Sequence, residues 1–405
     1  MRWWSGFKMT NAEATSVTDL LIASRTEPRA GDTAVRLAIV GMGLVGRRHL
    51  AALSHIDSAN ICAVVDTDDN ILELAEQAGI AGYSDLSEMI INTRPDGIIL
   101  STPTNLHVSQ GVDCIEAGIP VLIEKPIADD LASARLIVEK SEDFGVPVMV
   151  GHHRRFNPVI QQAKAALDSG QVGDIRVVDA KCWFYKPDDY FEIAPWRKKK
   201  GAGPISVNLV HDIDLLRYLC GDIINVQAQL SPSMRGYETE SIAAALLSFE
   251  NGGIGVVSVS DSAVSPWSWE FTSSEYPLYP FTAQSAYQIS GSHGALSIPD
   301  LTLWRHDDKP DWWSPMSSSK LPVEPADPLV NQIKHFARVI LGKEPPLVSG
   351  REGLCTLAVI EAMRIAAKTG QPVNPGDMVV GDSHTNTATT NFNIGSEVYF
   401  AAKPA

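Results

Sequence analysis

The sequence lacks the features that mark several large classes of protein. Its net charge is −15 at neutral pH, whereas a nucleic-acid backbone or an anionic membrane rewards a basic surface. Its five cysteines are scattered among 405 residues without the close spacing of a zinc site or a redox dithiol. No apolar run approaches the roughly 20 residues of a membrane helix, and the first residues show no signal-peptide core. We therefore expect a cytoplasmic protein with reduced thiols and a small-molecule partner, and no nucleic acid or membrane as main partner.

What is present is the composition of a folded protein with more than one domain. A chain of 405 residues is too long for one ordinary hydrophobic core, and 44% apolar with 20% charged residues is typical of globular proteins. Residues 1–34 show no sustained period and are predicted to form a flexible arm. We expect one domain over residues 35–155, a second over 156–377, and a flexible polar tail over 378–405.

The first predicted domain alternates short apolar runs with helical stretches. The runs are VRLAIV (35–40), ICAVVD (61–66), GIILST (97–102), VLIEK (121–125) and VPVMVG (146–151). Short strands separated by helices of ten or more residues imply a parallel, doubly wound α/β sheet of the Rossmann type. Gly79, Gly118 and Gly145 are placed to end three of the helices. Asp129 or Asp130 is a good N-cap for the helix that follows the fourth run.

The second predicted domain has a different rhythm. After about residue 155, strand-like runs with hairpin-like breaks dominate, and Asn251-Gly252-Gly253 is a strong turn signal between two of them. This pattern predicts an α+β domain, an antiparallel sheet with helices on one face. Two late helical stretches, 328–341 and 350–370, are expected to pack against that sheet.

A glycine-rich turn follows the first strand and opens a helix. Its residues are Gly41, Met42, Gly43, Leu44, Val45 and Gly46. The three glycines allow a tight turn, close approach of a pyrophosphate, and close contact of helix and sheet, while the helix N-terminus attracts phosphates. Asp66 ends the second strand, where its carboxylate can bind a ribose 2′-hydroxyl and would repel a 2′-phosphate. We therefore predict that NAD binds here in preference to NADP; the alternative is an ordinary glycine turn with a capping aspartate.

The run VLIEKPIADD stops on Glu124, Lys125 and Pro126. This charged pair is either a surface salt bridge of little energy or a chemical centre, because ligands of parallel sheets lie beyond the carboxyl ends of the strands. A lysine there can donate hydrogen bonds to a substrate hydroxyl and stabilise negative charge on its oxygen. The preceding strand also ends in polar residues that are candidates for cofactor binding: Thr102, Pro103, Asn105 and His107.

These motifs resemble those of the Gfo/Idh/MocA oxidoreductase family, which includes glucose–fructose oxidoreductase and inositol dehydrogenases. The resemblance covers roughly residues 35–375 and rests on the glycine turn, Thr102-Pro103, Glu124-Lys125-Pro126, and a helix with His211 and Asp214. It implies a Rossmann domain followed by a domain with a large open antiparallel sheet, through which relatives often form homodimers or homotetramers. It also implies that Lys125 lies at the substrate and that Glu124 points toward the cofactor ribose.

The stretch 201–221 is similar to the glycine-rich segment and catalytic helix of the family. This likeness makes His211 the candidate general base for the alcohol proton, a role that an ordinary imidazole pKa near 6.5 suits; the alternative is a satisfied core or interface histidine. Asp214 shares a helix face with His211 and either orients it or belongs to a buried network. Many polyol-oxidising relatives carry an aspartate where this chain has Val207, and the neighbouring Asn208 is a candidate substrate contact.

Three further groups of residues complete the prediction. Arg155, in GHHRRFNP, is a candidate substrate contact, and Trp196 with Arg197 lies in a loop that resembles one closing on the cofactor in relatives. Trp267, Trp269 and Phe271 alternate as on a strand and would share one face, either to stack on a substrate ring or to fill a core or subunit contact. The histidines form no constellation of metal ligands, so we predict no metal.

We therefore predict an NAD-dependent dehydrogenase that oxidises a secondary alcohol of a sugar, cyclitol or related polyol by hydride transfer to nicotinamide. Lys125 would polarise the oxygen, and His211 would move the proton. One alternative is a dehydrogenase of a cyclic diol (a dihydrodiol) in aromatic catabolism, because of the missing aspartate and the abundant tryptophans. Another is a non-catalytic dinucleotide-binding regulator, although a regulator would need neither Lys125 nor His211.

Overall fold

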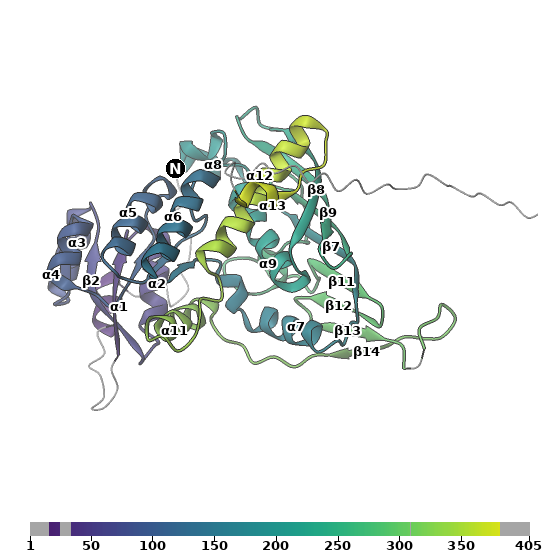
Figure 1. Cartoon of the computed structure of the whole chain (residues 1–405), viewed down its shortest axis with the longest axis horizontal. Coiled ribbons are helices and arrows are strands. Elements are labelled where there is room, and N and C mark those ends of the chain that lie inside the picture. The colour runs from purple at the N-terminus through teal and green to yellow at the C-terminus, as the bar shows by residue number, and fades with distance from the viewer. Residues whose placement is uncertain (1–15, 25–33, 308, 381–405) are drawn as a thin grey trace, which may run out of the picture.

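Two sheets organise the chain, and they form the two halves of the molecule in Figure 1. The structure is a computed structural model, and it describes residues 16–24, 34–307 and 309–380. The purple-to-blue half in Figure 1 contains the first sheet with helices on both sides, and the teal-to-green half contains the second.

The first sheet is entirely parallel and has the Rossmann strand order. Its strands are β1 (Val35–Val40), β2 (Ala59–Val65), β3 (Ala81–Tyr83), β4 (Gly97–Leu100), β5 (Val121–Ile123) and β6 (Val148–Val150). The order β3-β2-β1-β4-β5-β6 changes direction between β1 and β4, which is the switch point where doubly wound sheets bind their ligands. The predicted doubly wound sheet is confirmed; only the short strand β3, which is largely exposed, is absent from the predicted runs.

The helices of this half begin and end at the predicted signals. They are α2 (Leu44–Leu53), α3 (Asp69–Gln77), α4 (Leu86–Thr93), α5 (Thr104–Glu116) and α6 (Leu131–Phe144). Asp130 caps α6 by accepting a 2.9 Å hydrogen bond from the backbone N–H of Ser133. Gly79, Gly118 and Gly145 follow α3, α5 and α6 with φ of +69°, +75° and +66°, so the three predicted helix ends are confirmed.

The second sheet is mixed and mostly antiparallel. Its strands are β7 (Ile175–Trp183), β8 (Ile223–Pro232), β9 (Glu240–Phe249), β10 (Ile254–Ser260), β11 (Tyr287–Gly291), β12 (Gly294–Ile298), β13 (Thr302–Arg305) and β14 (Ser317–Lys320). The order is β14-β13-β12-β11-β7-β10-β9-β8. The predicted antiparallel sheet is confirmed except that β7 pairs with β10 in parallel. The turn predicted at Asn251-Gly252-Gly253 joins β9 to β10, with Gly252 at a φ of +85°.

Some of the helices that follow β6 cover one face of the second sheet. The helical elements after β6 are η1 (His153–Phe156), α7 (Pro158–Asp168), α8 (Asp188–Ile193), η2 (Pro195–Lys198), η3 (Ile205–Leu209), α9 (Val210–Cys220), α10 (Trp269–Thr272), α11 (Pro328–Ile340), α12 (Gly350–Thr369) and α13 (Pro375–Val380). In Figure 1, α7, α9, α12 and α13 lie on the side of the sheet that faces the first half. Buried and exposed residues alternate along β9, and Ile242 and Leu246 are 38% and 42% exposed on its outer face. No helix of the described ranges is both long and apolar enough to cross a membrane.

The helix α11 packs on the first core, not on the second sheet as the sequence predicts. Phe336 is fully buried in the same apolar cluster as the strands β1 and β2, and a side chain at Gly97 in β4 would collide with Ile340. The helix α12 contributes to both cores, with Leu354 in the first and Ile360 in the second. Apolar periodicity shows that a helix has a buried face but does not show which core receives it.

Part of the predicted flexible arm is a packed helix, α1 (Val17–Ala23). Leu21 is fully buried in the first core, and the carbonyl of Ser24 accepts a 3.1 Å hydrogen bond from the N–H of Ile61 in β2. The prediction of a loose arm is therefore wrong for residues 16–24, because the apolar run LLIA reaches the core. Likewise, the predicted tail begins within α13. Residues 1–15, 25–33 and 381–405 lie outside the described residues.

Candidate active site

The glycine turn between β1 and α2 has the backbone that its sequence predicts. Gly41 has a φ of +86°, a conformation that other residues rarely adopt. A side chain at Gly46 would collide with the carbonyl oxygen of Gly41, so the third glycine is needed for the helix to approach the strand. Nothing lies within 4 Å of the place where a side chain of Gly43 would be. The turn therefore leaves open space at its second glycine.

The residues around this turn fit a dinucleotide. Gly43 is the N-cap of α2 and offers no side chain to the first helical N–H groups, which is the arrangement that binds phosphates. Leu44 and Val45 are 74% and 37% exposed at the same helix start. Asp66 lies beside the turn because its Oδ2 accepts a 2.6 Å hydrogen bond from the N–H of Met42. These residues would hold a pyrophosphate at Gly43 and a ribose at Asp66.

The loop after β4 is tied to the loop after β5 by His107. The ring is buried, and its two nitrogens lie 3.0 and 2.9 Å from the carbonyl oxygens of Pro126 and Thr102. Both nitrogens are therefore engaged by the protein, and neither is left for the cofactor contact that we predicted. Pro103 and Asn105 are exposed at the start of α5, where they remain candidates for cofactor binding.

Glu124 is buried at the end of β5 and does not form a surface salt bridge with Lys125. One carboxylate oxygen lies 2.7 Å from Nε2 of His49 in α2, and the other accepts a 3.1 Å hydrogen bond from the N–H of Lys125. Burial would raise the pKa of Glu124, but the hydrogen bond and charge of His49 lower it to about 2, so the group is ionised. A side chain at Gly151, after β6, would collide with this carboxylate.

Lys125 reaches from the first domain into the second. Its Nζ donates a 3.4 Å hydrogen bond to the carbonyl of Val207, which lies in the π-helix η3 directly before α9. Burial lowers the pKa of Lys125 to about 8, so the ammonium form dominates at neutral pH. Short π-helices are rare and are frequent at functional sites. The structure thus brings the predicted catalytic lysine against the start of the predicted catalytic helix.

His211 lies one turn further along α9 and is 7% exposed. Its ring centroid is 5.6 Å from that of His153 and 6.1 Å from that of His152. Burial and the nearby charges of Lys125 and Arg154 lower the pKa of His211 well below 6.5. The ring is therefore neutral at neutral pH, the form that can accept a proton. Its Nδ1 has no partner among the described residues, so no side chain orients it through that atom.

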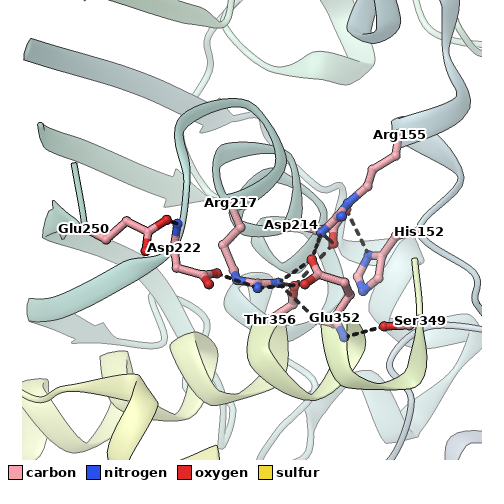
Figure 2. A network of polar contacts seen from close by, with 9 residues as sticks. All are labelled: His152, Arg155, Asp214, Arg217, Asp222, Glu250, Ser349, Glu352 and Thr356. Carbon is pink, nitrogen blue, oxygen red and sulfur yellow. Dashed lines mark hydrogen bonds and ion pairs between the residues drawn. The ribbon is translucent and has the colours of Figure 1, made fainter. Parts of the chain in front are cut away.

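Asp214 belongs to a buried network instead of orienting His211. Arg155 donates to both carboxylate oxygens of Asp214, at 2.9 and 2.7 Å, and to Glu352 at 2.9 Å. Thr356 donates to Asp214 at 3.2 Å, and Arg217 donates to Glu352 and Thr356. Figure 2 shows how this chain of contacts links η1, α9 and α12. Arg155 and Asp214 engage each other in this arrangement, and the substrate contact of Arg155 stays a prediction.

A second buried cluster surrounds Arg154. Its guanidinium lies 2.8 Å from Glu270 and 3.4 Å from Asp212, and Asp212 also accepts a hydrogen bond from the hydroxyl of Tyr287. Burial raises the pKa of Asp212 to about 6. Within the described residues, Nε of Arg154, Oδ2 of Asp212 and Oε2 of Glu270 have no hydrogen-bond partner. Sequence reasoning did not single out Arg154, although it stands beside the predicted Arg155.

The three alternating aromatic residues do not form a strand. Trp269 and Phe271 lie in the short helix α10, and Trp269 is buried whereas Trp267 is 38% exposed. The prediction of a shared face is therefore wrong. Trp269 instead packs under Arg154, whose guanidinium carbon is 5.6 Å from the ring centroid. Residues two apart share a face on a strand, whereas on a helix they point to different sides.

Asn208 is held by a lysine that sequence reasoning missed. Lys186 follows β7, is buried, and donates a 2.8 Å hydrogen bond from Nζ to Oδ1 of Asn208. The sequence did contain a signal, because Lys186-Pro187 repeats after β7 the lysine–proline pattern that Lys125-Pro126 shows after β5.

The loop that carries Trp196 and Arg197 folds as η2. Trp196 is 58% exposed, and Arg197 packs on the ring of Tyr190 in α8, 3.9 Å from its centroid. Both stay candidates for contact with the cofactor. No group of three or more potential metal-ligating side chains is found in the described ranges.

The fold and this site define a two-domain oxidoreductase with a dinucleotide-binding first domain. The chain matches the family model described as "Oxidoreductase family, NAD-binding Rossmann fold" over residues 35–152. It matches the "GFO/IDH/MocA C-terminal domain" over residues 160–297. The chain therefore belongs to the Gfo/Idh/MocA oxidoreductase family, as its motifs predict.

Particular relatives are dehydrogenases. The chain is 28% identical over 369 residues to the D-apiose dehydrogenase of Paraburkholderia graminis, covering 89% of this chain and 94% of that protein. It is 30% identical over 242 residues to the 4-carboxy-2-hydroxymuconate-6-semialdehyde dehydrogenase of a Sphingobium species, covering 54% and 73%. The WlbA dehydrogenase of Bordetella pertussis, solved with NADH and UDP-GlcNAcA, superimposes with a TM-score of 0.67 at 26% identity, covering 84% and 99%.

Proposed function

We propose that the protein is an NAD-dependent dehydrogenase that oxidises a secondary alcohol of a sugar, cyclitol or related polyol. The observation that carries this proposal is the contact of Lys125 with Val207, which brings the ammonium from the first domain to the turn before His211. The relatives named as sugar dehydrogenases support the substrate class.

The mechanism follows from the ionisation of the two side chains. NAD, when bound, supplies the acceptor for a hydride. The ammonium of Lys125, with a pKa of about 8, donates a hydrogen bond to the alcohol oxygen and stabilises its negative charge. The neutral imidazole of His211 accepts the hydroxyl proton, because burial and nearby cations hold its pKa well below 6.5. The alcohol carbon loses a hydride, its oxygen loses a proton, and a ketone results.

The preference for NAD over NADP rests on Asp66. Its carboxylate is held beside the glycine turn by the N–H of Met42, where it would bind a ribose hydroxyl and repel a 2′-phosphate. The residues that follow Asp66 are Thr67, Asp68 and Asp69, so the loop after β2 offers no cation of its own for that phosphate.

A homodimer or homotetramer formed through the open face of the second sheet is part of the proposal. Apolar residues are exposed on several of its strands: Val177, Ile242, Leu246, Ile254 and Val256. Exposed apolar patches of this kind commonly serve as contacts between proteins. The proposed location is the cytoplasm, and the free thiols of all five cysteines support a reducing compartment.

The test is NADH formation, followed by absorbance, with purified protein across sugars, sugar acids, cyclitols and cyclic diols. We expect turnover with NAD, a lower rate with NADP, and loss of activity in Lys125→Met and His211→Gln. Lys140→Met, which removes a surface lysine paired with Glu116, should leave the rate unchanged. Dinucleotide binding without turnover of any compound would contradict the enzymatic proposal, and absence of binding would overturn the assignment of the glycine turn.

A further inference from the structure

Lys186 is a buried cation without a counter-ion. The residue is 8% exposed, and no carboxylate of the described residues lies within the 4.0 Å ion-pair distance of its Nζ. Within the described residues, the ammonium makes one hydrogen bond, which goes to the neutral amide oxygen of Asn208 at 2.8 Å. Two aromatic rings also lie close to it, with Nζ 4.9 Å from the ring centroid of Tyr190 and 5.4 Å from that of Phe184.

Lys186 and Lys125 converge on the same turn from different domains. Lys125 contacts the carbonyl of Val207, and Lys186 contacts the side chain of Asn208, the next residue in η3. The two ammonium groups are close enough for Lys186 to contribute to the lowered pKa of Lys125. A second cation therefore stands beside the place where the proposed reaction occurs.

Two arginines of this region already pair with carboxylates. Arg154 pairs with Glu270 and Asp212, and Arg235 pairs with Asp261. Burial lowers the pKa of Lys186, and the charge of Asp261 opposes this shift, although its carboxylate lies beyond ion-pair distance. A buried ammonium without a counter-ion is costly, and an ammonium has three hydrogens to donate. Asn208 uses one, which leaves two for an incoming anion.

We propose that Lys186, oriented by Asn208, binds a carboxylate of the substrate. The substrate is then a sugar acid, that is, a polyhydroxy carboxylate of the uronate or aldonate class, and not a neutral polyol. This inference rests on the proposed function, since it takes the reacting hydroxyl to lie at Lys125 and His211, and it adds the chemical class that the second cation selects. Lysine suits the role because it acts as a point charge toward an anionic oxygen.

The first experiment measures binding without turnover. The NADH-loaded enzyme, which has no hydride acceptor for an alcohol, is titrated calorimetrically with matched pairs: D-galactose and D-galacturonate, D-glucose and D-glucuronate, and D-glucose and D-gluconate. We expect the acid of at least one pair to bind about 10- to 100-fold more tightly than its neutral partner, the range for a hydrogen bond to a charged group. Equal affinities within every pair would overturn the inference.

Variants then assign the preference to Lys186. In Lys186→Met the ratio of acid to neutral affinity should fall to about one, and in Lys186→Arg part of it should remain. Lys164→Met removes a surface lysine of α7 that pairs with Asp168 and should keep the full ratio. A preference that persists in Lys186→Met would overturn the inference.

Asn208→Asp provides a second test that changes few atoms. A carboxylate at this position would pair with Lys186 internally, so the preference for sugar acids should fall by about tenfold or more. An unchanged preference would contradict the role of the Lys186–Asn208 pair. Turnover of neutral polyols without any acid preference would leave the proposed function standing and remove this inference. Acid binding that depends on Lys186, without turnover of any alcohol, would support this inference and contradict the proposed function.

Discussion

Two buried clusters of charge are built around neighbouring arginines, Arg154 and Arg155, and they differ in how completely their groups are paired. Both residues are nearly inaccessible, with 5% and 2% exposure, and each contacts two carboxylates. Around Arg155, both carboxylate oxygens of Asp214 accept hydrogen bonds from the guanidinium, and one of them also accepts a hydrogen bond from the hydroxyl of Thr356. Around Arg154, one atom of each of the three charged groups lacks a partner within the described residues.

The difference separates a structural network from a site. A buried network whose charged groups are paired fixes the arrangement of its elements. The Arg155 cluster does so for η1, α9 and α12 (Figure 2), although Nδ1 of the neighbouring His152 has no hydrogen-bond partner within the described residues. Unpaired buried polar atoms are uncommon in folded proteins and call for water or a ligand. The unpaired atoms lie in the cluster whose arginine acts on the pKa values of both Lys125 and His211. Completeness of pairing therefore distinguishes two arginines that the sequence presents as equivalent.

Breaking the network around Arg155 should have the largest effect, which we expect on the free energy of unfolding. Arg155→Met leaves the carboxylate of Asp214 buried without its bidentate partner, and we expect the free energy of unfolding to fall by about 3–5 kcal/mol. Denaturant unfolding followed by circular dichroism measures this loss. The matched control is Arg351→Met, which removes an exposed ion pair with Glu142 and should cost less than about 1 kcal/mol. Similar losses in the two variants would show that the network is not structural.

Removing the ammonium of Lys125, to which we assign the catalytic role, should lower turnover and leave stability unchanged. In Lys125→Met we expect kcat to fall by about 10²- to 10³-fold, the effect of removing one donor from a developing oxyanion. The melting temperature should stay the same or rise, because a buried cation is lost. Steady-state kinetics and thermal unfolding on the same preparation test both parts. A kcat within about tenfold of the parent would contradict the assignment of Lys125.

The incomplete cluster should tolerate loss of its arginine better than the complete one. Asp212 has a pKa raised by burial to about 6 and retains the hydrogen bond from Tyr287, so it can become neutral after Arg154→Met. We expect a loss of about 1–3 kcal/mol in the free energy of unfolding, smaller than for Arg155→Met. Unfolding curves of the two variants, measured side by side, make the comparison. Equal losses would remove the distinction between the clusters.

The pH dependence of activity should respond to one arginine only. Because Lys125 must be protonated to donate, kcat/KM should fall as the pH rises through its pKa of about 8. The charge of Arg154 lowers this pKa, so Arg154→Met should move the alkaline fall to higher pH. Arg155→Met should leave it in place. A pH profile for the three proteins tests this, and a shift in Arg155→Met alone would contradict the assignment.

Local signals in the sequence were accurate where the backbone conformation of a single residue determines the turn or the helix cap. The glycines of the nucleotide turn, the cap at Asp130 and the turn at Gly252 are found as predicted, because they depend on φ values and on hydrogen bonds between near neighbours. Lys125 and His211 lie where their elements predict, after the end of β5 and at the start of α9, and their catalytic roles stay predictions. Lys186 was missed because its partner, Asn208, is 22 residues away in the chain.

Contacts between residues that are distant in the chain could not be predicted from local signals. The pattern of α11 shows an apolar face, but the first core receives it because space beside Gly97 accommodates Ile340. Arg155 was predicted to meet substrate, yet it is engaged by Asp214 and by Glu352, which lies 197 residues further along. Nothing within a few residues of Arg155 marks it as different from Arg154.

The sequence by itself determined the class of the protein: the parallel sheet, its dinucleotide turn, the lysine at the end of β5 and the histidine of α9. It could do so because hydrophobic period, glycine conformation and strand-end position are local properties. Only the tertiary structure decided which buried charges are paired and which are left beside the site. Pairing depends on contacts between segments far apart in the chain, and the energy of a buried charge depends on the partners those contacts provide.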